Sequence, residues 1–495
     1  MVDANGIDPG HTGFMILCTA LVQFMTPGLA LFYGGIVGST SVINVMFQSM
    51  VSLSVVFILW AIFGFSLTFG DPWFSLNGYH LLGDPRSFFM LEGVSVYGPL
   101  VRQGEVVTPG FPAMIFAAYQ GMFAVITPAL IAGSYVDRLR FGPNVLFLVA
   151  WLTLVYTPIG YWNWGGGVMY QLGARDFAGG IVVHESGGLS ALPCVWILGR
   201  RAVPPGRASA FFKQAHNVPF VLLGTAVLWL GWFGFNAGSA MASSGLAGLA
   251  LLNTQIAGAS GMAMWVVIDW FVQGKPKLVG ACAGALAGMV VITPCVGYVL
   301  PTKAFIAGVA GAIVCYSAVN IIDRLDLDDS VDTIGVHGVG GFLGTVFVGC
   351  LSDPEECADV KTAPAWCANP GTVTRSWRQV RIQLVCATLT AVYCCTATYL
   401  ILKLMTIRGI VPILKHYEDQ DSARDYEQFG EIAYAQHSVT PVPSTGTMAS
   451  RLMCAEVADE ESEDGDGSVS LDDYVKHDLI TPRQGNSRCL GLMPM

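Results

Sequence analysis

Charged side chains are scarce in this chain of 495 residues. Asp, Glu, Lys and Arg together make up 12% of it, whereas about 25% is usual in soluble domains. Hydrophobic residues make up 53%, and the mean hydropathy is +0.56. Such a chain cannot cover its apolar residues with polar surface, so the composition excludes an ordinary water-soluble fold.

Several functional signatures are also missing. HExxH, GxSxG and a paired catalytic Asp motif do not occur, so we predict that the protein is not an enzyme. No basic patch suggests a nucleic-acid partner. Alternating segments of about ten residues, typical of β-barrels, are absent. The net charge is −10, but 16 acidic and 7 basic residues lie from Leu404 onward, so the acidity describes a tail.

Long apolar runs fill most of the chain. Each is long enough to cross a ~30 Å hydrocarbon layer as a helix. The first run lacks a basic leader and is too long for a signal-peptide core, so we predict that it is retained. The runs predict an all-α polytopic membrane protein with eleven transmembrane helices, at about 11–37, 41–69, 112–135, 143–162, 177–199, 217–238, 247–272, 277–298, 303–323, 333–352 and 380–404.

Basic residues in short loops predict the orientation in the membrane. They gather after the third, fifth and seventh spans, on one side, and the positive-inside rule makes that side the cytoplasm. Residues 1–10 are then extracellular and the tail is cytoplasmic. The basic residues concerned are Arg138, Arg140, Arg200, Arg201, Arg207, Lys213, Lys275 and Lys277.

An internal repeat divides the predicted membrane domain, 11–404. The fifth span contains Val183-His184-Glu185-Ser186-Gly187-Gly188, and the tenth contains Val336-His337-Gly338-Val339-Gly340-Gly341. Each V-H-x-x-G-G segment closes a block of five spans, about 11–199 and 217–352, and blocks of five must enter from opposite sides. The pattern predicts a 5+5 inverted repeat with a site near the midplane, followed by a peripheral last helix at 380–404.

The part of the chain after the last span has two compositions. Residues 405–435 carry mixed charge, and we predict a cytoplasmic C-terminal regulatory region there. Residues 436–495 are acidic with Ser and Gly, which favours disorder. Ser462, Ser468 and Ser470 lie in or beside acidic residues, a context that suits phosphorylation by a regulatory kinase or another signalling partner. The alternative is a solvated tail without regulation.

His184 and His337 lie deep inside apolar spans. Ionisable groups within a membrane usually face a pathway, and an imidazole offers a donor and an acceptor nitrogen and titrates near neutral pH. Two such rings side by side predict a proton relay in a pore. One alternative is hydrogen bonding to backbone carbonyls between helices. The other, a metal site, lacks further ligands at suitable spacing, and we predict neither a metal nor a cofactor.

Aromatic side chains cluster at the predicted outer ends of the spans. They predict either an aromatic belt at the interface or a cage that holds a small cation. Asp176, eight residues before His184, is a helix N-cap, a carboxylate that stabilises a cation, or both. The aromatic residues with their polar neighbour are Tyr119, Phe123, Trp164, Trp232, Phe235 and Ser239.

Four motifs resemble, in order, the signatures of the ammonium transporter (Amt/Mep/Rh) family. The resemblance covers about residues 11–435, and the retained first histidine looks like the fungal high-affinity Mep branch. The motifs are Pro27-Gly-Leu-Ala-Leu-Phe-Tyr-Gly-Gly35, Asp176-Phe-Ala-Gly-Gly-Ile-Val-Val-His184, Gly231-Trp-Phe-Gly-Phe-Asn-Ala-Gly-Ser239 and Asp332-Thr-Ile-Gly-Val-His-Gly338.

This resemblance implies an Amt-type homotrimer in the plasma membrane, surrounded by lipid, with one pore per subunit for ammonium and methylammonium. It also implies roles for individual residues. An outer substrate site corresponds to Trp164, Ser239, Tyr119 and Phe123, a gate to Phe123 and Phe235, a pore relay to His184 and His337, and supporting positions to Asp176, Trp232, Phe32 and Tyr33.

Three departures from the family pattern stand out. Tyr119 occupies a position where many relatives have Phe, and Glu185 is an unusual charge inside the fifth span. Ala423 stands where a glycine is expected in the tail motif, although Asp425 fits that motif. A disulfide between Cys357 and Cys367, which lie in a polar loop, is left open by the sequence.

Selectivity for ammonium cannot rest on charge and radius, because NH4+ and K+ are alike in both. We therefore predict that NH4+ is recruited outside, loses its proton, and crosses as NH3 while the proton passes along the histidines, so that uptake is electrogenic. The alternatives are an electroneutral NH3 channel of the Rh type and a receptor that senses ammonium with minor transport.

Overall fold

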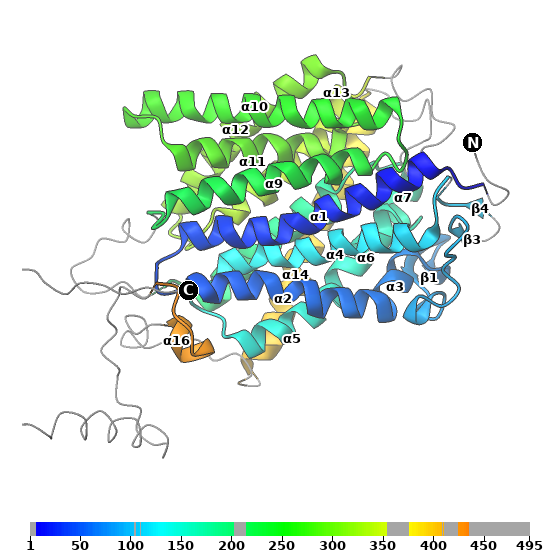
Figure 1. Ribbon diagram of the computed structural model, residues 1–495, viewed down its shortest axis with the longest axis horizontal. Helices are drawn as coiled ribbons and strands as arrows, with labels where there is room; N and C mark the ends of the chain where they lie inside the picture. Colours follow the sequence, from blue (N-terminus) through cyan, green and yellow to red (C-terminus); the bar gives the residue numbers. More distant parts are fainter. Residues whose placement is uncertain are drawn as a thin grey trace, which may run out of the picture. The chain divides into compact units, whose positions relative to one another are not determined.

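The computed structural model describes residues 6–102, 105–108, 110–201, 214–353, 376–407, 409 and 424–434. Within them, eleven helices are long and apolar enough to cross a membrane, and they run side by side (Figure 1). This confirms the predicted all-α fold of eleven spans. The spans are Pro9–Ile36, Val42–Phe69, Ala113–Tyr135, Phe141–Leu172, Gly180–Leu198, Val218–Gly238, Gly245–Gln273, Leu278–Cys295, Pro301–Arg324, Ile334–Leu351 and Trp377–Ile407.

Several spans are built from more than one helical segment. Short π-helical turns, labelled η, interrupt or open four of them, and a 3₁₀ turn ends another. The segments in chain order are α1 (Pro9–Ile36), α2 (Val42–Leu59), η1 (Trp60–Gly64), α3 (Phe65–Phe69), α4 (Ala113–Tyr135), α5 (Phe141–Trp151), η3 (Leu152–Tyr156), α6 (Thr157–Asn163), α7 (Val168–Leu172), η4 (Gly180–Glu185), α8 (Ser186–Leu198), α9 (Val218–Gly238), α10 (Gly245–Gln273), α11 (Leu278–Ile292), η6 (Thr293–Cys295), α12 (Pro301–Arg324), η7 (Ile334–Val339), α13 (Gly340–Leu351), α14 (Trp377–Ile407) and α16 (Arg424–Phe429).

The loop between the second and third spans contains two small hairpins, which the sequence analysis did not predict. β1 (Pro72–Leu76) pairs antiparallel with β2 (Tyr79–Gly83), and β3 (Val101–Arg102) with β4 (Glu105–Val106); the 3₁₀ turn η2 (Phe89–Leu91) lies between them. Asn77 and Gly78 join the first pair with φ of 52° and 84°. Asn-Gly with two positive φ angles is the favoured two-residue hairpin turn, so the signal was present in the sequence.

α1 and α9, the first helices of the two repeat blocks, pack closely along their length. Glycines make this possible, since a Cβ on Gly224 would come within 2.3 Å of the Phe32 backbone nitrogen, and one on Gly28 within 2.9 Å of Val227. Membrane helices use such small residues to approach one another. The contact brings Phe32 and Tyr33 of α1 toward the centre of the protein.

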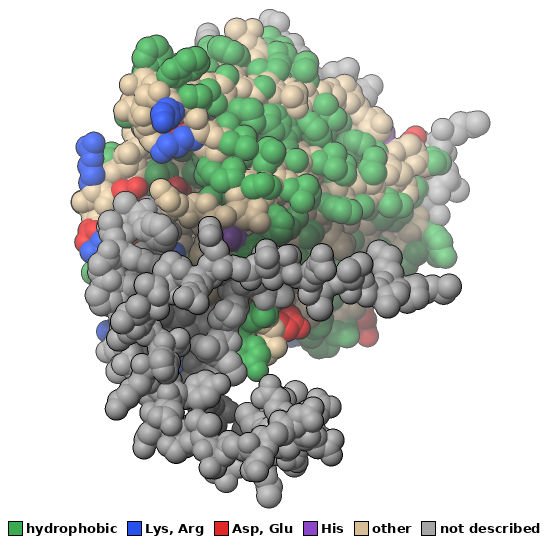
Figure 2. All heavy atoms as spheres, turned by 60° about the vertical axis from the view of Figure 1, so that its left-hand side comes forward, with side chains coloured by type: hydrophobic (Ala, Val, Ile, Leu, Met, Phe, Trp, Pro, Cys, Tyr) green, Lys and Arg blue, Asp and Glu red, His purple; other side chains and the backbone are tan. Residues whose placement is uncertain are grey.

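The outer surface of the helix bundle is largely apolar. Hydrophobic side chains spread across its middle, whereas Lys, Arg, Asp and Glu gather mainly toward the ends of the helices (Figure 2). Large side chains such as Ile16, Phe24 and Leu230 are more than half exposed. A surface of this kind suits hydrocarbon and would be rare on a soluble monomer.

The tail segment 424–434 lies against the ends of several spans, at the end of the bundle opposite the β1–β2 hairpin (Figure 1). The Phe429 ring of α16 lies 5.2 Å from the Phe47 ring and 5.5 Å from the Phe141 ring, between centroids. We call this end the tail face. The predicted phosphorylation sites Ser462, Ser468 and Ser470, and the cysteines Cys357 and Cys367, lie outside the described residues.

Polar contacts also join this segment to the bundle. The Asp425 carboxylate accepts hydrogen bonds from the backbone N–H groups of Ile43 and Asn44, at 2.9 and 2.8 Å. These belong to the first turn of α2, where backbone donors have no partner within the helix. The Tyr434 hydroxyl lies 2.8 Å from Nε2 of His216, just before α9.

Candidate functional site

Both V-H-x-x-G-G segments begin in π-helical turns. His184 lies in η4 and His337 in η7, and each turn leads directly into the α-helix that completes its span. A π-turn widens the helix by one residue and is frequent at functional sites. The two repeated segments therefore share a local structure as well as a sequence motif.

The last glycine of each segment packs against the other segment. A Cβ on Gly188 would lie 2.0 Å from the Gly338 nitrogen, and one on Gly341 would lie 2.6 Å from the Glu185 nitrogen and 3.0 Å from the His184 Cβ. Any side chain at either position would force the two turns apart. The paired glycines are thus the reason that the two histidines can meet.

His184 and His337 face one another inside the bundle. Their Nδ1 atoms lie 3.3 Å apart, and the ring centroids lie 5.3 Å apart with 29° between the planes. Both residues are buried, with exposed fractions of 2% and 6%. Because an Nδ1 pair needs one donor and one acceptor, two neutral rings in this arrangement share a single proton between them. His184 Nε2 has no hydrogen-bond partner.

An acidic residue precedes each histidine by eight positions. The Asp176 carboxylate accepts four backbone N–H groups at the start of η4, from Gly179 to Val182, at 2.7 to 3.1 Å. Asp329 Oδ2 accepts the N–H of Ile334 at the start of η7, at 2.7 Å. A carboxylate is well placed at the positive end of a helix. Asp176 was predicted from the sequence and Asp329 was not, although Asp329 precedes His337 by the same eight residues that separate Asp176 from His184.

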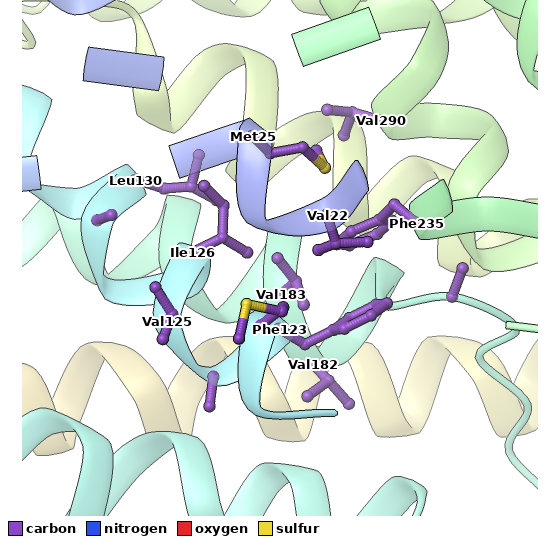
Figure 3. Close-up of a cluster of buried hydrophobic side chains, with 14 of the residues drawn as sticks. Val22, Met25, Phe123, Val125, Ile126, Leu130, Val182, Val183, Phe235 and Val290 are labelled. Atoms are coloured by element: carbon purple, nitrogen blue, oxygen red, sulfur yellow. The ribbon is translucent and has the colours of Figure 1, made fainter. Parts of the chain in front are cut away.

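Phe123 of α4 and Phe235 of α9 stack beside the histidines. Their centroids lie 4.2 Å apart with 21° between the planes, and neither side chain is exposed. Figure 3 shows the two rings among apolar side chains that include Val22, Met25 and Val183. Rings in this contact leave no passage between them.

A group of aromatic and hydroxyl side chains also adjoins this stack. Trp164 meets Phe123 edge to face at 5.8 Å between centroids, and its Nε1 donates to the Asp176 carbonyl at 3.0 Å. The Tyr119 hydroxyl donates to the Phe235 carbonyl at 2.8 Å and lies 3.3 Å from Ser239 Oγ. Tyr119 therefore engages protein groups, and the four predicted outer-site residues lie together.

A narrow cavity of about 50 Å³ is lined by Phe235 and by both histidines. A water molecule occupies about 30 Å³ in the liquid, so only very small molecules fit. Trp232 stacks on His184 at 5.2 Å between centroids and donates from Nε1 to Thr293 Oγ1 at 3.0 Å. Phe32 and Tyr33 also line the cavity. All the residues predicted to form the gate, relay and pore wall are thus brought together.

Two charged residues lie near the site but make no hydrogen bond to either histidine among the described contacts: Arg102 and Glu185. Arg102, from the loop before the third span, donates to the Gly165 carbonyl next to Trp164, at 2.5 Å; nothing in the sequence pattern placed it there. Glu185 is fully buried, and neither of its carboxylate oxygens has a hydrogen-bond partner. It lies in η4, which contacts α14.

Comparison with known proteins gives a consistent result. Residues 13–434 match the model of the Ammonium Transporter Family. An ammonium transporter of Bacillus subtilis (strain 168) is 38% identical over 426 residues, which are 86% of this chain and 98% of that protein. Ammonium transporter 1 of Schizosaccharomyces pombe (strain 972) is 34% identical over 467 residues, 92% and 89% of the two chains. The crystal structure of Candida albicans Mep2 aligns with a TM-score of 0.76 at 34% identity, covering 90% of this chain and 96% of that one.

Proposed function

This chain belongs to the Ammonium Transporter Family, and on that premise we propose that it carries ammonium across the plasma membrane in an electrogenic cycle that separates NH3 from its proton. Ammonium transport by a multi-pass membrane protein is common to the family and its relatives. The cycle is our inference. The observation that supports it best is the 3.3 Å contact between His184 Nδ1 and His337 Nδ1, inside a cavity closed by stacked rings.

The cycle begins at Trp164, Tyr119, Phe123 and Ser239. Aromatic faces attract a small cation by about 0.5–2 kcal/mol, more when water is excluded, and Ser239 Oγ offers a lone pair to an N–H group. The β1–β2 hairpin and the beginning of α1 lie toward this end of the bundle (Figure 1). We take this end as extracellular and the tail face as cytoplasmic.

Deprotonation follows at Phe123 and Phe235. A bare cation in a dry, apolar cavity is far more costly than a neutral amine, so NH4+ leaves its proton behind as the rings open and NH3 enters. K+ has no proton to lose and is excluded. This step accounts for selectivity that charge and radius cannot supply.

The proton travels along the histidines. His184 Nε2, which has no hydrogen-bond partner, takes up the proton as the Nδ1–H of His184 passes to His337 Nδ1 and the Nε2–H of His337 is released. Both rings are then neutral again. NH3 crosses the same cavity of about 50 Å³. One positive charge moves for every NH3 delivered, and the two recombine as NH4+ on the other side. We further propose the homotrimer that the family resemblance implies, with one such pore in each subunit.

The experiment that tests this proposal is a current recording on purified protein in proteoliposomes, with NH4+, methylammonium and K+ in turn. We expect transient currents with the first two and none with K+. Ammonia flux without current would replace the proposal with an electroneutral channel. A K+ current of similar size would contradict the selectivity step.

Sensing of ammonium is a second candidate function, favoured by the docked tail segment. Tyr434 and Asp425 join residues 424–434 to the ends of α9 and α2, so a change in the bundle could reach a cytoplasmic partner through them. A pore variant without transport that still signals in cells would support a receptor role. Loss of signalling in parallel with transport would make sensing secondary.

A further inference from the structure

A second and larger cavity opens at the tail-face end of the histidine cavity. It has a volume of about 550 Å³ and is lined by residues of α10, α11, α12 and the loop before η7. Val279, Ala283 and Asp332 line both cavities, so the two adjoin. We call this larger space the inner cavity.

Carboxylates dominate the charge of the inner cavity. Among the described residues, its charged lining consists of Asp269, Asp323, Asp332 and Lys277. The rings of Trp265 and Tyr316 also line it and meet edge to face at 5.3 Å between centroids. Acidic groups beside aromatic faces are the surroundings that a small organic or ammonium cation prefers.

Asp269 is the most informative of these acids. Its exposed fraction is 1%, and Gln273 Nε2 donates to its Oδ1 at 3.0 Å. Its Oδ2 has no hydrogen-bond partner. That oxygen lies over Gly280, another lining residue, where a Cβ would come within 2.0 Å of it. An unpaired buried charge is costly, so a ligand that donates a hydrogen bond to this oxygen would be stabilised there.

We propose that the inner cavity is a second ammonium site, which holds the cation after NH3 and the proton recombine and before release to the cytoplasm. The proposal rests on the function proposed above. In it the carboxylate of Asp269 accepts an N–H group of the cation, and Asp332, at the junction, draws the cation out of the histidine cavity.

The chemistry of the lining selects ammonium over other ligands. Among the described residues no group of three or more His, Cys, Asp and Glu is close enough to hold a metal ion, so the acids surround a wider space than a metal coordination shell. Within the described lining, three carboxylates and one amine disfavour an anion. The aromatic wall and the connection to the histidine cavity favour a small cation that the pore itself delivers.

Excised membrane patches can test this site separately from the outer one. In inside-out patches we expect Asp269→Asn to raise the half-saturating concentration of cytoplasmic ammonium about fivefold, the size of one partly hydrated charge pair. In outside-out patches the same variant should leave the value for external ammonium unchanged. Lys277→Gln, which removes the opposing charge, should lower the cytoplasmic value.

Two further measurements keep the test decisive. Gly280→Ala retains every charge but displaces the Asp269 carboxylate, and it should reproduce the effect of Asp269→Asn. Radiolabelled methylammonium binding to purified Trp164→Leu protein, in which the outer site is weakened, should be saturable and should be lost when Asp269→Asn is added.

The outcomes separate the two proposals. Binding that persists in Trp164→Leu protein and depends on Asp269, with no current in any patch, would contradict the electrogenic cycle and keep the inner site. A normal ammonium current together with cytoplasmic half-saturation and methylammonium binding that ignore Asp269, Lys277 and Gly280 would overturn the inner site. An equal effect on both faces would also overturn it.

Discussion

His184 Nδ1 and His337 Nδ1 lie 3.3 Å apart, although 153 residues separate them in the chain. The contact joins equivalent positions of the two repeat blocks and lies in a cavity of about 50 Å³. Each ring reaches it from a π-turn whose first N–H groups bond to an acid eight residues earlier, Asp176 or Asp329. The geometry is therefore set by the backbone of both repeats as well as by the two side chains.

Close packing of the two π-turns gives the first prediction. Gly188→Ala inserts a Cβ 2.0 Å from the Gly338 nitrogen, and Gly341→Ala inserts one 2.6 Å from the Glu185 nitrogen. Overpacking of this kind destabilises by about 1–3 kcal/mol, and we expect a lower thermal midpoint together with loss of ammonium current. Gly248→Ala is the matched control, because a Cβ there meets nothing within 4 Å. Normal transport in both test variants would show that the turns can separate without consequence.

The outer aromatic group gives the second prediction. Trp164→Leu removes an aromatic face but keeps an apolar side chain, so it should raise the external half-saturating concentration of ammonium about tenfold, as expected for the loss of ~1–2 kcal/mol of cation–π attraction. The maximal current should change less. Concentration dependence of current measures both quantities, and an unchanged half-saturation would dismiss the aromatic cage.

The hydroxyl of Tyr119 gives the third prediction. This hydroxyl has one proton, which it can donate either to the Phe235 carbonyl or to Ser239 Oγ at 3.3 Å. When it donates to Ser239 Oγ, it competes with a bound cation for the serine lone pair. We expect Tyr119→Phe to lower the half-saturating concentration by a factor of about 2–5, the value of one modest hydrogen bond. Weaker binding in this variant would mean that the hydroxyl serves the cation directly.

The tail segment gives a prediction about pH. Burial raises the pKa of Asp425 to about 6, with the nearby Asp137 carboxylate adding to the effect and hydrogen bonds from Ile43 and Asn44 opposing it. Because the docked carboxyl binds a proton more tightly than a solvated one, docking should strengthen as the pH falls from 7 through 6 toward 4, and this gain should be lost as the pH rises above 6.

Hydrogen exchange of the 424–434 peptide, corrected for intrinsic rates, measures that docking. Protection should be greater at pH 5.5 than at pH 7.5 in the natural protein. Asp425→Asn, which cannot titrate at this position, should lose the gain in protection at pH 5.5. Protection that increases with pH in the natural protein would contradict the predicted strengthening of docking at low pH.

The sequence was sufficient to predict the spans because their length and apolarity are imposed by the hydrocarbon layer. The repeat was visible in the sequence because the two blocks need the same residues to pack together. His184 and His337 meet only if the glycines that follow each of them allow close contact. Phe123, Phe235 and Trp164 were found through family motifs, since their spacing alone also suits an interfacial belt.

Other features depend on contacts that no local pattern records. Arg102 reaches the Gly165 carbonyl from a distant hairpin, and Asp269 meets the inner cavity only because α10, α11 and α12 pack around it. The π-turns at His184 and His337 come from the packing of glycines, and local residue preferences do not predict them. Two misses were avoidable, however: the Asn77-Gly78 turn and the eight-residue spacing of Asp329 from His337 could both be read from the chain.

The separation of cargo from proton is tested most directly by the variant His184→Ala with His337→Ala, reconstituted and recorded with NH4+ and K+ in parallel. A cycle that separates NH3 from its proton predicts that the selective ammonium current disappears, or that K+ now carries a comparable current through the emptied cavity. An ammonium current that keeps its size and still excludes K+ would contradict it.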